Sequence, residues 1–142
     1  MKISARNQFQ GKVAAVVPGA VNTEVELTLS GGQQIVSVVT NQSAKALKLE
    51  AGKDVVALIK ASSVLVMTED AGLTLSARNC LTGKVKSLNI GPVHAEVVIA
   101  MDGGAEVHAS ITHQAATELG LKEGAAATAV FKASSVILGI PS

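Results

Sequence analysis

Aromatic residues and cysteine are nearly absent from this sequence. It has no tryptophan, no tyrosine, two phenylalanines and a single cysteine, Cys80. One cysteine excludes an internal disulfide and any CxxC metal site. Proteins that bind single-stranded nucleic acid stack bases on aromatic side chains, so this composition argues against that class of partner. The lack of disulfides is typical of a cytoplasmic protein.

Strong charge and long apolar runs are missing too. The formal net charge is +1, which provides no basic field for nucleic acid or an anionic membrane. No stretch reaches the roughly 18 apolar residues of a membrane helix, and the first residues do not resemble a signal peptide. We therefore expect no nucleic-acid partner, no membrane partner and a cytoplasmic location.

The usual signatures of nucleotide binding and catalysis are absent as well. The sequence contains neither G-x-x-x-x-G-K-[ST] nor G-x-G-x-x-G. The three histidines, His94, His108 and His113, have no carboxylate or cysteine partners at metal-ligand spacing. No serine occupies a nucleophile elbow, and no pair of carboxylates recurs, so we expect no enzymatic activity.

What the sequence does have is an internal repeat without gaps. The tetrapeptide S-A-R-N at residues 4–7 returns at residues 76–79, and K-A-S-S-V at residues 60–64 returns at residues 132–136. From residue 4 to residue 64, 25 of 61 positions match the residue 72 positions later. Such a repeat indicates one structural unit used twice. We place the two domains at residues 1–67 and 75–142, joined by a linker at residues 68–74.

Alternating valine-rich segments predict that each repeat is mostly β-sheet. In the first repeat we expect strands at residues 11–17, 21–29, 34–39, 54–59 and 64–67, separated by turns. A short helix is expected at residues 40–47, before Gly52, and at residues 112–119, before Gly120. The predicted fold class is all-β with one short helix per repeat, as tandem OB-like β-barrel domains. Since 48% of the residues are hydrophobic, extensive contacts between repeats and between chains are expected.

The most closely repeated runs are polar and hold hydrogen-bond donors. Each repeat has an arginine beside a serine, a threonine at the start of the helix and a lysine followed by two serines. Arginine offers a fork of donors, lysine a compact charge and a helix start free N–H groups, which together suit a small tetrahedral dianion. Each feature alone has a simpler interpretation: Arg6 paired with Glu24, Thr40 as a helix cap and Lys60 as an edge-strand lysine. The residues alone leave both interpretations open.

The motifs S-A-R-N, T-x-x-S and K-A-S follow one another in this order and, with one serine replaced, do so again in the second repeat. They resemble the molybdate-binding domain of the molbindins, also called the molybdenum-pterin-binding proteins. The resemblance implies an OB-like barrel that binds molybdate, and usually tungstate, as an intact oxyanion without direct protein–metal ligands. It also implies storage or buffering of the ion in the cytoplasm for molybdenum homeostasis. Molbindins form rings of six domains with the ion between domains, so a two-domain chain would form a homotrimer.

The resemblance further implies a set of oxyanion-binding residues. The sequence departs from the family pattern at two positions. Ala115 replaces the serine of T-x-x-S, which removes one implied contact with the ion. Cys80 replaces the glutamine that follows the first S-A-R-N, which is expected to affect local packing only. A separate hypothesis is a second anion site, since Asn22 and His94 are equivalent potential donors that could converge on a threefold axis. The implied ligand residues, with the alanines acting through the backbone, are Ser4, Ala5, Arg6, Thr40, Ser43, Lys60, Ala61, Ser62, Ser76, Ala77, Arg78, Thr112, Lys132, Ala133 and Ser134.

Two other functional classes stay open from the sequence. One is a molybdate-responsive interaction or sensor module that changes partners when the ion binds. A pull-down with and without molybdate separates it from a store, because a store needs no partner. The other is an enzyme acting on a pterin or a sulfate ester, which is disfavoured because no candidate base recurs in both repeats.

Overall fold

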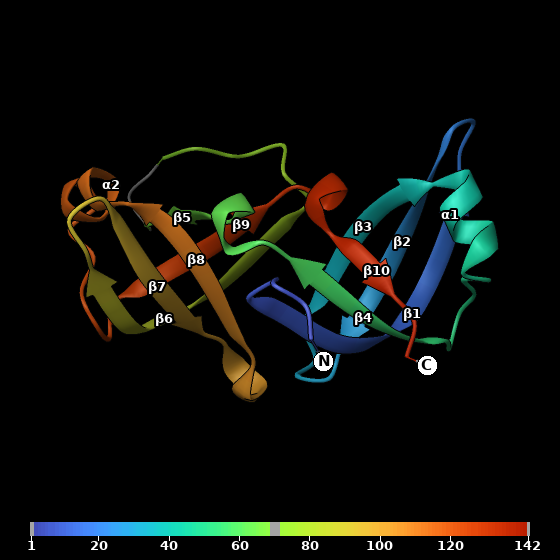
Figure 1. The fold of residues 1–142 in the computed structure, drawn as a ribbon, viewed down its shortest axis with the longest axis horizontal. Helices are drawn as coiled ribbons and strands as arrows, with labels where there is room; N and C mark the ends of the chain where they lie inside the picture. The colour runs from blue at the N-terminus through green and yellow to red at the C-terminus, as the bar shows by residue number, and fades with distance from the viewer. Residues whose placement is uncertain (1, 69–71, 142) are drawn as a thin grey trace.

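The computed structural model describes residues 2–68 and 72–141, and the two repeats have the same order of elements. They lie side by side along the long axis of the molecule (Figure 1). The first repeat comprises β1 (Asn7–Pro18), β2 (Asn22–Leu29), β3 (Gln34–Thr40), α1 (Asn41–Ala46), β4 (Asp54–Ile59), η1 (Ala61–Ser63) and β5 (Leu65–Met67). The second comprises β6 (Asn79–Ile90), β7 (His94–Ala100), η3 (Asp102–Gly104), β8 (Glu106–Thr112), α2 (His113–Glu118), β9 (Ala126–Phe131), η4 (Ala133–Ser135) and β10 (Ile137–Gly139).

The alternation in β2 predicts its buried face well. Val25, Leu27 and Leu29 are buried, as is Thr23, while the intervening glutamates point outward. Val21 was expected on the same face, but it precedes the strand and is 73% exposed. The strand β1 begins at Asn7, four residues earlier than predicted, so the motif S-A-R-N runs directly into the sheet.

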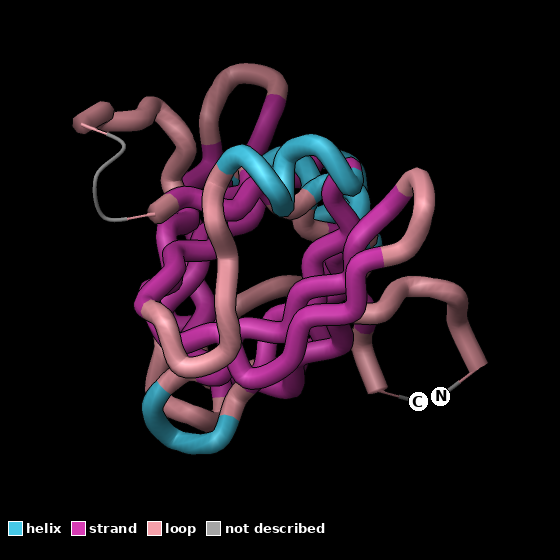
Figure 2. Tube along the Cα trace, turned by 90° about the vertical axis from the view of Figure 1, so that its left-hand side faces the viewer, coloured by secondary structure: helices cyan, strands magenta, loops and turns pink. Residues whose placement is uncertain are grey.

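The long first strand of each repeat bends so that its sheet curls. A β-bulge interrupts the register of β1 with β2 between Val13 and Ala15, and β6 has the equivalent bulge against β7. Bulges increase strand twist and bending. Gly11 permits the close approach of the neighbouring strand, because a Cβ there would lie 2.6 Å from the carbonyl oxygen of Thr28. Viewed along the long axis, the strands curl around the core, with helical segments and loops outside them (Figure 2).

Both predicted helices are present and are one residue shorter at each end. Thr40 caps α1, since its Oγ1 accepts a hydrogen bond from the backbone N–H of Ser43 at 3.1 Å. The residue after the C-cap is in the left-handed conformation in both repeats: Gly120 (φ 61°) in the second, but Lys48 (φ 53°) in the first. Gly52 follows the end of the first helix as expected, in the turn that leads to β4. No helix among the described residues is long and apolar enough to cross a membrane.

The shortest strands are exchanged between the repeats. One sheet has the order β10-β4-β1-β2-β3, and the other has the order β5-β9-β6-β7-β8. Thus β10, from the second repeat, pairs with β4, and β5, from the first, pairs with β9. The expectation that each fifth strand completes the barrel of its own repeat is therefore wrong. A three-residue strand does not specify by its own pattern which sheet edge it will join.

The exchange joins the two repeats into one hydrophobic core. Buried side chains of both repeats form a single cluster that includes Phe9, Val25, Val97 and Phe131. The turn η4 packs on β3, and η1 packs on β8. Buried Ser37 supports this contact by donating a hydrogen bond from its Oγ to the carbonyl oxygen of Val136 at 2.8 Å. The predicted linker at residues 68–74 lies partly outside the described residues, at 69–71.

Candidate functional site

Two of the three repeated motifs meet at one cavity in the second repeat. The cavity has a volume of about 500 Å³. Residues 76–78 precede β6 and residues 132–134 follow β9, and these strands pair antiparallel from Asn79 opposite Phe131. Antiparallel pairing therefore places the end of one motif beside the start of the other. The lining consists of Val38, Leu65, Leu75, Ser76, Ala77, Arg78, Val130, Lys132, Ala133 and Ser134.

The first repeat has the same local arrangement. Asn7 pairs with Ile59, so residues 4–6 lie beside residues 60–62. Lys60 precedes the 3₁₀ turn η1 as Lys132 precedes η4, and neither side chain makes a capping hydrogen bond. Both lysines are exposed, and no ion pair found in the described part of the chain involves either of them. Each repeat therefore presents a free ammonium group next to serine hydroxyls and the first N–H groups of a turn.

The third motif is far from this cavity within one chain. The helices α1 and α2 lie at opposite ends of the molecule, whereas residues 60–62 and 132–134 lie between them (Figure 1). Thr40 donates a hydrogen bond to the Oγ of Ser43 at 2.8 Å, and Thr112 accepts one from the N–H of Ala115 at 3.0 Å. The helix-cap interpretation of both threonines is confirmed. Their role as ligands stays a prediction, because neither Thr40 nor Thr112 lines the cavity.

The positions proposed for a second anion site lie at the helix ends. Asn22 and His94 begin β2 and β7 and are exposed. In the sheet register Asn22 is opposite Thr40, and His94 is opposite Thr112. The structure thus groups each of them with the threonine of its own repeat rather than with the arginine or the lysine.

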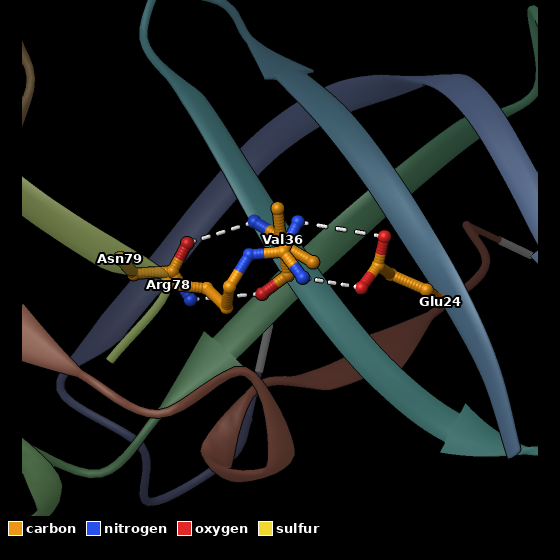
Figure 3. A network of polar contacts seen from close by, with 4 residues as sticks. All are labelled: Glu24, Val36, Arg78 and Asn79. Atoms are coloured by element: carbon orange, nitrogen blue, oxygen red, sulfur yellow. Dashed lines mark hydrogen bonds and ion pairs between the residues drawn. The ribbon is translucent and has the colours of Figure 1, made fainter. Parts of the chain in front are cut away.

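The motif arginines are paired with glutamates, but across the repeats. Arg78 donates from Nη1 to Oε1 of Glu24 at 2.5 Å and from Nη2 to Oε2 at 3.5 Å (Figure 3). Arg6 makes the equivalent ion pair with Glu96, with 3.5 Å between Nη1 and Oε2. The alternative that paired Arg6 with Glu24 of its own repeat is therefore wrong in the choice of repeat. The fold swaps the partners because each motif packs against the opposite sheet.

The motif asparagines have a structural role that was not predicted from the sequence. The side-chain amide of Asn79 donates to the carbonyl oxygen of Val36 and accepts from its N–H, both at 2.8 Å (Figure 3). Asn7 does the same to His108, at 2.8 and 2.7 Å. Both asparagines are almost fully buried. Each amide thus acts like one residue of an additional strand on β3 or β8, the edge strands of the two sheets. The sequence did contain a signal for this role, because the asparagine is repeated exactly and stands beside buried strand positions.

The replacement of Gln8 by cysteine affects only the loop of the motif. Gln8 donates from Nε2 to the carbonyl oxygen of Ala5 at 3.0 Å. Its counterpart Cys80 contacts the carbonyl oxygen of Ala77 at 3.8 Å, through a weaker thiol donor. In both repeats this side chain bonds back to the alanine carbonyl of S-A-R-N, and the hydrogen bond of the cysteine is the weaker of the two.

Comparisons with known proteins identify the family of each repeat. The sequence matches the TOBE domain family twice, over residues 3–66 and 75–138. It is 45% identical over 140 residues to the molybdenum transport protein ModE of Herbaspirillum seropedicae, covering 99% of this chain and 52% of that protein. It is 43% identical over 141 residues to the molybdenum-pterin-binding protein MopA of Rhodobacter capsulatus, covering 99% and 53% respectively. The chain therefore spans about half the length of these curated relatives.

A solved structure also resembles this chain over nearly the whole length of both. It is that of the cytoplasmic molybdate-binding protein ModG, in a form with molybdate bound. The two chains share 56% sequence identity, the TM-score is 0.96, and the match covers 99% of this chain and 100% of the other.

Proposed function

Since this chain belongs to the molbindin family, with a TOBE domain in each repeat, we propose that it binds molybdate in the cytoplasm and stores or buffers the ion. The observation that carries the proposal is the cavity in which Arg78, Lys132 and Ser134 converge. A tetrahedral dianion matches this set of charged and neutral donors. Tungstate has the same charge and nearly the same size and is expected to bind as well.

The metal is bound as an oxyanion rather than through protein ligands. The described residues contain no group of three or more histidine, cysteine, aspartate or glutamate side chains able to hold a metal ion. The arginine and the lysine of a repeat supply charge, the serine hydroxyls supply neutral donors, and the alanines contribute backbone N–H groups. The protein has no catalytic role in this proposal, because binding and release of the ion are its whole activity.

The direct test is metal analysis combined with titration. Protein purified from cells supplied with molybdate should contain molybdenum, and the protein freed of the ion should bind added molybdate until saturated. A protein that retains no molybdate under either condition contradicts the proposed function. The number of ions bound per chain also tests the second anion site: it should fall in the Asn22→Ala/His94→Ala protein if these side chains hold further ions.

We further propose that the functional unit is a homotrimer, since one chain does not assemble the complete set of motifs. Residues 40–43 and 112 lie at the outer ends of the molecule, so a second copy must bring them to the cavity. Leu65 and Ile137 are 63% and 62% exposed on the short exchanged strands, and Leu65 and Leu75 line both the site cavity and an adjacent apolar cavity. Burying such side chains between chains would stabilise the assembly.

The trimer is checked by analytical ultracentrifugation. The sedimenting species should have three times the chain mass of 14.3 kDa, and molybdate should stabilise it by mass action. A well-folded monomer that persists with molybdate present contradicts the trimer. Neither nucleic acid nor a membrane is expected as a partner, given the net charge of +1 and the lack of aromatic platforms.

A further inference from the structure

The arginine of the site cavity is already occupied by a carboxylate from the other repeat. Arg78 lines the cavity beside Lys132, and its two terminal nitrogens both face the carboxylate of Glu24 (Figure 3). A guanidinium group presents one planar fork of donors, which carboxylates and tetrahedral oxyanions use in the same way. Glu24 is not among the residues that line the cavity, but its carboxylate already uses the guanidinium donors that an oxyanion in the cavity would need.

We propose that Glu24 and Glu96 are built-in competitors of the bound oxyanion, each holding the motif arginine of the opposite repeat when the ion is absent. This inference rests on the proposed function, because it concerns the same cavity. The ion binds by drawing the guanidinium away from the carboxylate, so the carboxylate lowers the affinity of the site and favours release of the ion.

The surroundings confine this exchange to the arginine side chain. The next residue, Asn79, is 2% exposed and is fixed to Val36 by two hydrogen bonds, so the backbone at the motif is held in place. The arginine and glutamate side chains are 52% and 30% exposed. Ion pairs at this degree of exposure are weak and exchange readily. The ion pair can therefore open without disturbing the two hydrogen bonds between Asn79 and Val36 beside it.

The two repeats differ in how firmly the arginine is held. Glu24 meets Arg78 through both carboxylate oxygens, with a shortest distance of 2.5 Å. The ion pair of Glu96 with Arg6 has one contact, at 3.5 Å. Competition is therefore stronger at the site that contains Arg78 than at the site that contains Arg6. The two kinds of site differ in their affinity for the oxyanion for this reason.

The experiment compares molybdate titrations of the native protein with Glu24→Gln, Glu96→Gln and Glu26→Gln. Glutamine keeps the size of the side chain and removes its charge. Glu24→Gln should tighten binding at one class of site by about three- to tenfold, and Glu96→Gln by less, since like charge near a partly exposed anion has a modest cost. Glu26 is the matched control, because it lies two residues from Glu24 on the same face of β2, about 7 Å along the strand. Glu26→Gln removes the same charge, and no ion pair among the described residues joins Glu26 to an arginine.

A double mutant separates competition for Arg78 from a general effect of charge. In the Arg78→Gln background, Glu24→Gln should give little or no gain in affinity, because the contested donor is missing. Unchanged or weaker binding in Glu24→Gln, or an equal gain in Glu26→Gln, overturns the inference. These outcomes all presuppose that the native protein binds molybdate, and failure of that binding overturns the proposed function instead. Far-ultraviolet circular dichroism of each variant verifies the fold, and Glu96→Gln provides the same test if Glu24→Gln does not fold.

Discussion

Replacing Lys60 and Lys132 together by alanine is expected to lower molybdate affinity by about ten- to a hundredfold at every site built on the motifs. Each lysine provides a charge-assisted hydrogen bond to its own ion, and losing such a bond to a charged group costs about 1.5–3 kcal/mol. The lysines are exposed and make no capping hydrogen bond, so the fold should be unaffected. Isothermal titration calorimetry with molybdate measures the loss.

The control for this double variant removes the same charge elsewhere. Lys84 and Lys122 are exposed lysines outside the motifs S-A-R-N, T-x-x-S and K-A-S. Lys84→Ala/Lys122→Ala should bind molybdate almost as tightly as the native protein, with only the small change that a lower net charge produces. Equal affinities for the native protein and for Lys60→Ala/Lys132→Ala would show that the ion binds somewhere else.

Asn79→Ala should destabilise the protein by about 2–4 kcal/mol, because it removes a buried amide and leaves the partly buried N–H and carbonyl of Val36 without their partner. The native amide satisfies both groups at 2.8 Å and closes the open edge of β3. Asn7→Ala should have an effect of similar size on β8. The loss of unfolding free energy is measured by urea denaturation of the protein without molybdate.

The same strand offers a control for this substitution. Asn89 lies on β6, ten residues after Asn79, and is exposed. Asn89→Ala should change the free energy of unfolding by less than about 0.5 kcal/mol, as is usual for surface positions. If Asn79→Ala were as mild as Asn89→Ala, the amide would not hold the two repeats together.

Local features of the fold were predictable because they depend on neighbouring residues. The alternation of residues 23–29 identifies the buried face of β2, and Thr40 and Thr112 identify the helix starts. The meeting of S-A-R-N with K-A-S follows from antiparallel pairing of the strands that these motifs flank. The distance of the T-x-x-S motif from the cavity was not predictable, because it depends on how the two repeats are arranged in the whole molecule.

The sequence could not reveal which repeat supplies a given partner. Glu24 and Glu96 occupy equivalent positions, so a gapless repeat offers each arginine two chemically identical candidates. The same ambiguity applies to β5 and β10, because either sheet edge accepts a three-residue strand. The exchange is accompanied by the packing of η1 on β8 and of η4 on β3, which the repeat pattern alone does not predict. The repeat thus shows which types of residue are in contact, but only the three-dimensional fold shows which repeat supplies each partner.

The exchange of β5 and β10 also sets the order in which parts of the protein can fold during synthesis. The first sheet needs β10 at its edge, and residues 137–139 leave the ribosome long after β1 to β4. Until then β4 presents an unpaired edge, which is the kind of surface that recruits strands from other chains. The amino-terminal half therefore cannot complete its folding as an independent unit during translation. Rapid elongation through the second repeat, or cover from a chaperone, would protect the nascent chain in this interval.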